Sequence, residues 1–158
     1  MCPYQKGFTL IELVIVMSLV AVISAFSIST LHRGIEHEKQ YARLYELGQT
    51  ILFARNYAIS HNTSVTLCPS ENQHSCQESW DSGAILLAAH TTIISLPALP
   101  KGHRLTLEAY PKSNAIQFTH TGILSVSNGK FIYILPDGSV RDLFISKTGR
   151  IRFSQGGK

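Results

Sequence analysis

The pattern of hydrophobic and polar residues divides the chain into three stretches, and the first is almost entirely apolar. From residue 8 to residue 31, Glu12 is the only charged side chain. A helix needs about 20 apolar residues to cross the hydrocarbon core of a membrane, and this stretch is long enough. The pattern therefore predicts a membrane-spanning helix over residues 8–31.

The second stretch, residues 32–60, has the periodicity of an amphipathic helix. Its mostly apolar residues recur at the i, i+3, i+4 spacing that places them on one helix face, and charges such as Glu38 and Lys39 mostly fall elsewhere. The predicted stripe comprises Tyr41, Leu44, Tyr45, Gly48, Ile51, Leu52, Arg55, Ala58 and Ile59. We expect the first helix to continue to residue 60 and to pack this stripe on the rest of the chain.

The third stretch, residues 61–153, consists of short apolar runs separated by turn residues. Strands are predicted at 63–68, 84–90, 92–96, 104–110, 115–119, 130–135, 140–146 and 149–153. The pairs Lys101-Gly102 and Asn128-Gly129 and the segments 111–114 and 136–138 are turn signals, and we expect Asn128-Gly129 and 136–138 to close hairpins. The sequence thus predicts an α+β fold, a long N-terminal helix on an antiparallel β domain, with a flexible tail over residues 154–158.

Positive charge is concentrated at the C-terminal end. Residues 1–129 carry eight Lys and Arg side chains and eight carboxylates, so the net charge of +4 arises after that point. There the carboxylates are Asp137 and Asp142, and the cations are Lys130, Arg141, Lys147, Arg150, Arg152 and Lys158. The basicity of the protein therefore belongs to its last strands.

Two of these cations are one residue apart in a predicted strand. Alternation places Arg150 and Arg152 on one face, and Ile151 and Phe153 on the other. Arginine is a planar donor suited to phosphates. One interpretation is therefore a site for the phosphate backbone of a nucleic acid. The alternative is a final hairpin, turning at Thr148-Gly149, whose solvent face happens to carry arginines.

Other residues are expected to extend this surface. Lys130, Arg141 and Lys147 could add positive charge to it. Phe153 is the aromatic residue expected to be accessible there, with Phe144 and Tyr133 buried. We therefore expect phosphate contacts that tolerate any sequence and weaken with salt, and no reading of bases.

The N-terminal residues 6–16, KGFTLIELVIV, resemble the leader junction of type IV pilins and type II secretion pseudopilins. The resemblance implies that a prepilin peptidase removes residues 1–7 by cutting after Gly7, and that Phe8 becomes the methylated N-terminus. It also implies that Glu12 neutralises the N-terminal amine of a neighbouring subunit during filament assembly. A carboxylate in a membrane helix is costly unless it is paired or close to the headgroups, so a shallow, headgroup-reaching Glu12 is the alternative.

The C-terminal half resembles the GspH/FimT branch of the pilin superfamily in residues 118–122 and 145–152. In FimT-like minor pilins a Gly-Arg-x-Arg motif, matched here by residues 149–152, is associated with DNA binding in natural transformation. The resemblance implies a minor type IV pilin that binds DNA for uptake, or a GspH-like pseudopilin or structural minor pilin that primes filament assembly through other pilin subunits. It also implies a single pass through the bacterial inner membrane, a periplasmic C-terminal domain and assembly into a pilus at the cell surface; Lys6 favours a cytoplasmic leader.

The cysteines and histidines suggest no catalytic chemistry. Cys2 lies in the leader, which leaves Cys68 and Cys76 in a domain expected to be extracytoplasmic, where a disulfide is favoured. The alternative is a metal site that these cysteines form with His74 or His61, but their spacing lacks the close pairs of zinc sites. No nucleophile or metal motif is recognisable, so we expect neither an enzyme nor a cofactor.

Overall fold

The computed structural model describes the backbone of residues 9–155 and the side chains of residues 9–24 and 41–155. The predictions for Gly7, Phe8 and residues 156–158 lie outside this part of the chain. The helix α1 (Leu10–Ser60) covers both predicted helical stretches. The chain divides within this helix into two compact units, residues 1–41 and 42–158.

The first unit contains the N-terminal part of α1. Every side chain described from residue 9 to residue 24 is exposed, and the large apolar ones among them have exposed fractions of 51–82%. Among the residues that the structure describes, no helix is long and apolar enough to cross a membrane.

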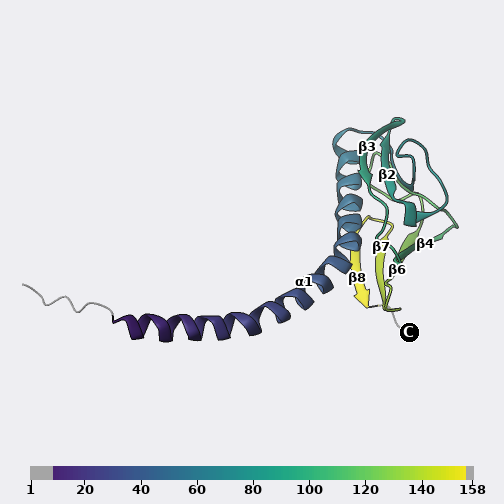
Figure 1. Ribbon diagram of the computed structural model, residues 1–158. Coiled ribbons are helices and arrows are strands. Elements are labelled where there is room, and N and C mark those ends of the chain that lie inside the picture. The colour runs from purple at the N-terminus through teal and green to yellow at the C-terminus, as the bar shows by residue number, and fades with distance from the viewer. Residues whose placement is uncertain (1–8, 156–158) are drawn as a thin grey trace, which may run out of the picture. The chain divides into compact units, whose positions relative to one another are not determined.

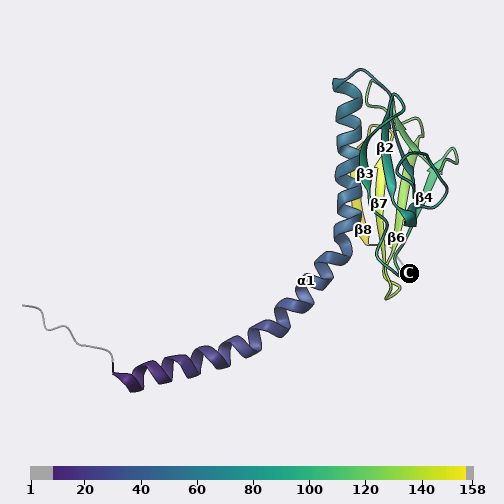
Figure 2. The same cartoon turned by 45° about the horizontal axis from the view of Figure 1, so that its top comes forward.

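The second unit contains two antiparallel four-stranded sheets (Figure 1, Figure 2). The first sheet has the order β3-β2-β1-β5 and consists of β1 (Val65–Pro69), β2 (Ala84–Ala88), β3 (Thr91–Leu96) and β5 (Ile116–Phe118). The second sheet has the order β4-β6-β7-β8 and consists of β4 (Arg104–Tyr110), β6 (Asn128–Ile134), β7 (Val140–Ser146) and β8 (Ile151–Gln155). The α+β fold and the eight predicted strands are confirmed, and a short 3-10 helix, η1 (Trp80–Ser82), was not predicted.

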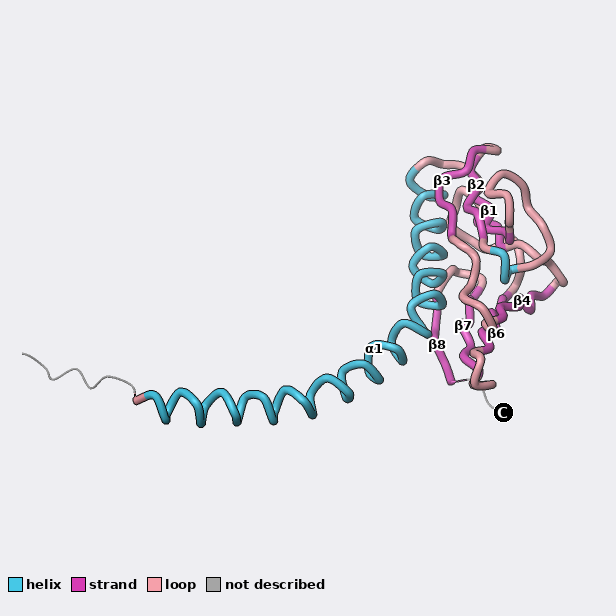
Figure 3. The backbone as a smooth tube through the Cα atoms, viewed as in Figure 1, coloured by secondary structure: helices cyan, strands magenta, loops and turns pink. Residues whose placement is uncertain are grey.

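The core lies between the C-terminal part of α1 and the sheets. Alternating residues of the second sheet point inward, among them Phe131, Tyr133, Leu143 and Ile145, and these side chains are fully or almost fully buried. In Figure 3, as in the two ribbon views, β8 lies directly beside α1. The helix contributes the buried side chains of Leu44, Leu47, Ile51, Ala54 and Ala58.

The predicted helix stripe is correct in part. Leu44, Ile51 and Ala58 are buried as expected, whereas Tyr45 and Ile59 are 59% and 47% exposed. The buried face therefore turns toward the positions of Leu47 and Ala54, which were not included in the prediction.

The predicted turn at Asn128-Gly129 is wrong. Both residues lie inside β6, where they pair with Tyr110 and Ala109 of β4 and with Ser146 and Ile145 of β7. Pairing on both sides outweighs the local turn preference of the Asn-Gly dipeptide. The hairpin between β6 and β7 instead turns at residues 136–138, as predicted, where Leu135 N–H donates to Ser139 O at 2.9 Å.

The C-terminal strand begins and ends two residues later than predicted. β8 ends at Gln155, so Ser154 and Gln155, which were assigned to the flexible tail, belong to the sheet. They pair with Asp142 and Arg141 of β7.

The disulfide is confirmed. Cys68 lies in β1 with a fully buried side chain and is bonded to Cys76, with the two Cα atoms 5.5 Å apart. The metal alternative has no support in the described residues, which contain no group of three or more potential His, Cys, Asp or Glu ligands.

We predict that replacing both cysteines, Cys68→Ser/Cys76→Ser, lowers the free energy of unfolding by about 2–3 kcal/mol, because the bridge restricts an eight-residue separation in the unfolded chain. The fluorescence of Trp80, the single tryptophan, during urea unfolding measures this. Adding a reductant to the parent should produce the same loss and should leave the double variant unchanged. Equal stability of parent and variant in the absence of reductant would contradict the prediction.

Candidate functional site

The C-terminal hairpin holds the two arginines of the candidate site. β7 and β8 are joined by a tight turn in which Gly149 N–H donates to Ser146 O at 2.8 Å and Ser146 N–H donates to Arg150 O at 3.0 Å. Gly149 has a φ of +75°, in the left-handed region that favours glycine. The predicted hairpin at Thr148-Gly149 is therefore confirmed.

The turn packs directly against α1. A Cβ at Gly149 would overlap Arg55 Cδ and come within 3.0 Å of Phe118 Cε1. The Arg55 side chain continues past this contact, and its Nε–H donates to Gly122 O at 3.3 Å. The glycine of the Gly-Arg-x-Arg motif thus has a structural explanation, because only glycine provides both the conformation and the space.

The two faces of β8 differ as the alternation predicts. Phe153 points toward α1, where its ring stacks on that of Tyr45 with 5.0 Å between centroids and 5° between planes. Gly48 makes room for it, since a Cβ there would lie 2.8 Å from Phe153 Cζ. Arg150 and Arg152 lie on the opposite, outward face, and both are exposed.

The outward face carries an open groove of about 510 Å³. Strand pairing arranges its lining in two rows across the sheet. One row runs from Glu108 through Lys130 and Phe144 to Arg152, and the second contains Tyr110, Asn128, Ser146 and Arg150. The sequence expectation for the aromatic residues was wrong for Phe144, which was expected to be buried but is 41% exposed in the groove. Phe153 is 38% exposed, as expected, although its ring stacks on the helix, and Tyr133 is buried as expected.

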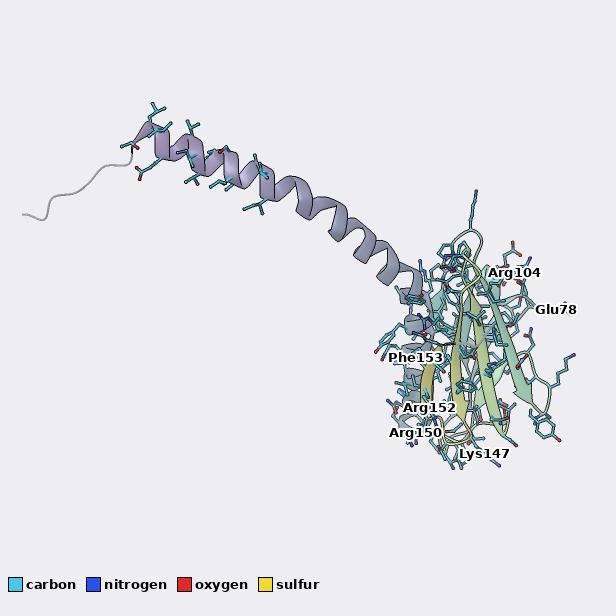
Figure 4. All side chains as sticks on the ribbon, turned by 90° about the horizontal axis from the view of Figure 1, so that it is seen from below. Glu78, Arg104, Lys147, Arg150, Arg152 and Phe153 are labelled. Atoms are coloured by element: carbon cyan, nitrogen blue, oxygen red, sulfur yellow. A yellow bond between two sulfur atoms is a disulfide. The ribbon has the colours of Figure 1, made fainter. Side chains whose placement is uncertain are left out.

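The predicted cations do not all share this surface. Arg150, Arg152 and Lys130 line the groove, and Lys147 is exposed at the end of the hairpin. Figure 4 shows Arg150, Arg152 and Lys147 gathered at one end of the domain, away from Arg104. Arg141 is a correction to the prediction. It pairs with the buried Tyr133 and so belongs to the inward-facing set of β7.

The cations of the groove differ in their electrostatic partners. Lys130 Nζ lies 3.3 Å from Asp142 Oδ2 and 5.7 Å from the centroid of the Phe144 ring. Asp142 is almost completely buried, so this pairing offsets much of the charge of Lys130. Within the described residues neither Arg150 nor Arg152 forms an ion pair with a carboxylate. The two arginines are therefore the cations of the groove that are available to an anionic ligand.

Glu12, the predicted assembly residue, has a local partner at the start of α1. The Thr9 backbone N–H and Oγ1–H both donate to Glu12 Oε2 at 3.1 Å, and Glu12 N–H donates to Thr9 Oγ1 at 3.3 Å. This is a capping box, in which each residue satisfies the other at a helix N-terminus. The Thr-x-x-Glu spacing is its sequence signal, and it gives Glu12 a role that neither sequence interpretation includes.

Two family models match the chain. The model described as Type II transport protein GspH matches residues 45–149. The model described as prokaryotic N-terminal methylation motif matches residues 2–28, which include the predicted leader junction. No curated protein matches the chain significantly.

Solved structures share the fold. The crystal structure of the type IV minor pilin FimU of Pseudomonas aeruginosa (strain PAO1) is 20% identical, with a TM-score of 0.56 over 75% of this chain and 90% of that chain. The minor pseudopilin EpsH from the Type 2 Secretion System of Vibrio cholerae is 13% identical, with a TM-score of 0.51 over 72% of this chain and 94% of that chain. At these identities the likeness shows the fold alone.

We predict that Gly149→Ala destabilises the domain by about 2 kcal/mol more than Gly138→Ala does. Both glycines have positive φ, +75° and +79°, so both substitutions carry the conformational cost of about 1–2 kcal/mol. A Cβ at Gly138 meets nothing within 4 Å, whereas one at Gly149 adds the overlap with Arg55, which typically costs about 1–3 kcal/mol. Urea unfolding followed by Trp80 fluorescence compares the two, and equal losses would contradict the close packing of the turn on α1.

Proposed function

We propose that this chain, a member of the GspH family, binds the phosphate backbone of DNA through Arg150 and Arg152. The chain is a minor type IV pilin or pseudopilin, and the DNA binding would serve DNA uptake in natural transformation. The observation that carries the proposal is the pair of exposed guanidinium groups on the outward face of the C-terminal hairpin, without a carboxylate partner among the described residues. A guanidinium group presents a planar set of N–H donors that matches a phosphate in a bidentate manner.

The positive charge that supports DNA binding is located at one side of the groove. Within the groove Lys130 is offset by Asp142, and Glu108 adds a negative charge at the β4 edge. The free positive charge is thus confined to the β8 side, with Lys147 at the adjacent turn. Such a short cationic edge suits contacts with a few phosphates, and affinity should depend on salt and little on base sequence.

A second candidate function is contact with another pilin subunit. The exposed ring of Phe144 beside two arginines favours it, because aromatic residues and arginine are enriched at protein interfaces. In this case the groove would serve filament assembly, as in a pseudopilin or structural minor pilin, and DNA would not be a ligand.

We also propose the route by which the subunit reaches a filament. A prepilin peptidase would cut between Gly7 and Phe8 within the segment that matches the methylation motif. The apolar segment 8–31 would hold the subunit in the bacterial inner membrane, with the β domain in the periplasm, until assembly with other pilin subunits into a pilus.

The DNA proposal is tested with the full-length chain in neutral detergent and a labelled short duplex. We expect binding that weakens steeply with salt, and we expect Arg150→Ala/Arg152→Ala to reduce affinity about tenfold or more. Loss of two phosphate contacts should also reduce the slope of log K against log[salt] by about 2. Fluorescence anisotropy over a series of salt concentrations gives both quantities.

Lys101→Ala/Lys112→Ala is the matched control, because it removes the same charge from exposed positions outside the groove. This control should retain most of the parent's affinity. Two results would overturn the proposal: equal affinity of the parent and the arginine variant, or no binding by the parent at low salt. The second result would leave subunit contact as the function.

Glu12→Gln separates the two roles of Glu12. Glutamine also completes a capping box, so the start of α1 is retained while the charge is lost. If Glu12 pairs with the amine of a neighbouring subunit, Glu12→Gln should be cleaved normally by the peptidase but should be depleted from sheared pili as strongly as Glu12→Ala. Immunoblots of cell and pilus fractions measure this. Normal incorporation of the Gln variant would reduce Glu12 to a capping residue.

A further inference from the structure

The chemical groups that line the groove on the second sheet differ between its β8 side and its β4 edge. The β8 side carries the guanidinium groups of Arg150 and Arg152, the middle carries the ring of Phe144, and the β4 edge carries Tyr110 and the Glu108 carboxylate. Adjacent strands lie about 4.8 Å apart, so this change occurs over about 14 Å. The groove therefore offers donors for an anion at one side and aromatic and acceptor groups toward the other.

Phe144 occupies a position suited to stacking. Strand pairing places it between Lys130 and Arg152, and the residue is 41% exposed on an inner strand of the four-stranded sheet. Sheet faces that hold single-stranded nucleic acids combine exposed aromatic rings, on which unpaired bases stack, with nearby cations for the backbone. Phe144 and the two arginines supply both components within neighbouring positions.

The β4 edge adds a second aromatic position and groups that can bond to base edges. Tyr110 is 75% exposed. It lies two strands away from Phe144 and two residues further along β4, which corresponds to a distance of about 12 Å. Asn128, in the same row as Tyr110, has an amide that can donate and accept. The Glu108 carboxylate can accept from the exocyclic amino group of a base.

We infer that the groove binds unpaired nucleotides of single-stranded DNA, with phosphates on Arg150 and Arg152, one base on Phe144 and another toward Tyr110. The inference rests on the proposed function, because it uses the same arginines for the backbone. It assigns the rest of the groove, which phosphate binding leaves without a role, to the bases.

A duplex cannot use the whole groove in this way. Its bases are stacked on one another within the helix, so only phosphates, sugars and base edges are accessible to the protein. Duplex binding would engage the arginines alone, whereas a single strand would engage the arginines and Phe144. The groove should therefore favour single-stranded DNA, or the frayed end of a duplex, over closed duplex.

The test compares a labelled single strand without self-complementarity with the duplex of the same sequence, using the full-length chain in neutral detergent. We expect the single strand to bind about tenfold more tightly than the duplex at equal salt. Phe144→Leu, which keeps an apolar side chain but removes the ring, should lower single-strand affinity about tenfold and change duplex affinity less than about twofold. Phe53→Leu is the matched control, because Phe53 is 42% exposed on α1, outside the groove, and both affinities should be retained.

The outcomes separate this inference from the proposed function. Equal affinity for the two forms, or a Phe144→Leu variant that retains the parent's preference, would overturn the single-strand inference while leaving phosphate binding in place. Binding of neither form would overturn both. We expect Arg150→Ala/Arg152→Ala to lose affinity for both the single strand and the duplex. We expect Phe144→Leu to lose affinity for the single strand alone.

Discussion

Gly48, Gly122 and Gly149 allow α1 and the C-terminal β segments to approach more closely than residues with a Cβ would permit. At these positions a Cβ would come into steric conflict with Phe153, Ile59 and Arg55 respectively. The Arg55 side chain fills the space between Gly122 and Gly149 and donates to the first of them. This contact fixes the turn of the C-terminal hairpin on the helix, and through the turn it fixes which way each residue of β8 points.

The candidate site is a consequence of this arrangement. Because Ile151 and Phe153 are directed to α1, the residues between and before them are directed outward, and these are the arginines. The same register brings Phe144 and Lys130 beside Arg152. Among the cations of the groove, Lys130 forms an ion pair with Asp142, whereas Arg150 and Arg152 remain available to a ligand. In the Gly-Arg-x-Arg sequence, the glycine thus packs the turn against the helix, and the two arginines form the exposed surface.

The sequence predicted the features that depend on local pattern. Periodicity located α1 and the strands, and β alternation placed Arg150 opposite Phe153. The sequence did not predict the features that depend on pairing between segments far apart in the chain. Asn128-Gly129 reads locally as a turn but is paired on both sides in β6, and Arg141 reads as part of the basic cluster although its register partner is the buried Tyr133. Phe144 was expected inside because it is large and apolar, but strand parity places it on the open face. The capping box of Thr9 and Glu12, by contrast, was readable from spacing alone.

Contact of Arg150 and Arg152 with DNA phosphates can be observed at the arginine side chains themselves. In the full-length chain labelled with ¹⁵N-arginine, the Nε–Hε resonances can be followed while DNA is added. We expect the signals of Arg150 and Arg152 to shift, and those of Arg104, at the other end of the sheet, and of Arg55, beneath the turn, to stay in place. Shifts confined to Arg104 or Arg55, or DNA binding that leaves every arginine signal unchanged, would contradict these phosphate contacts.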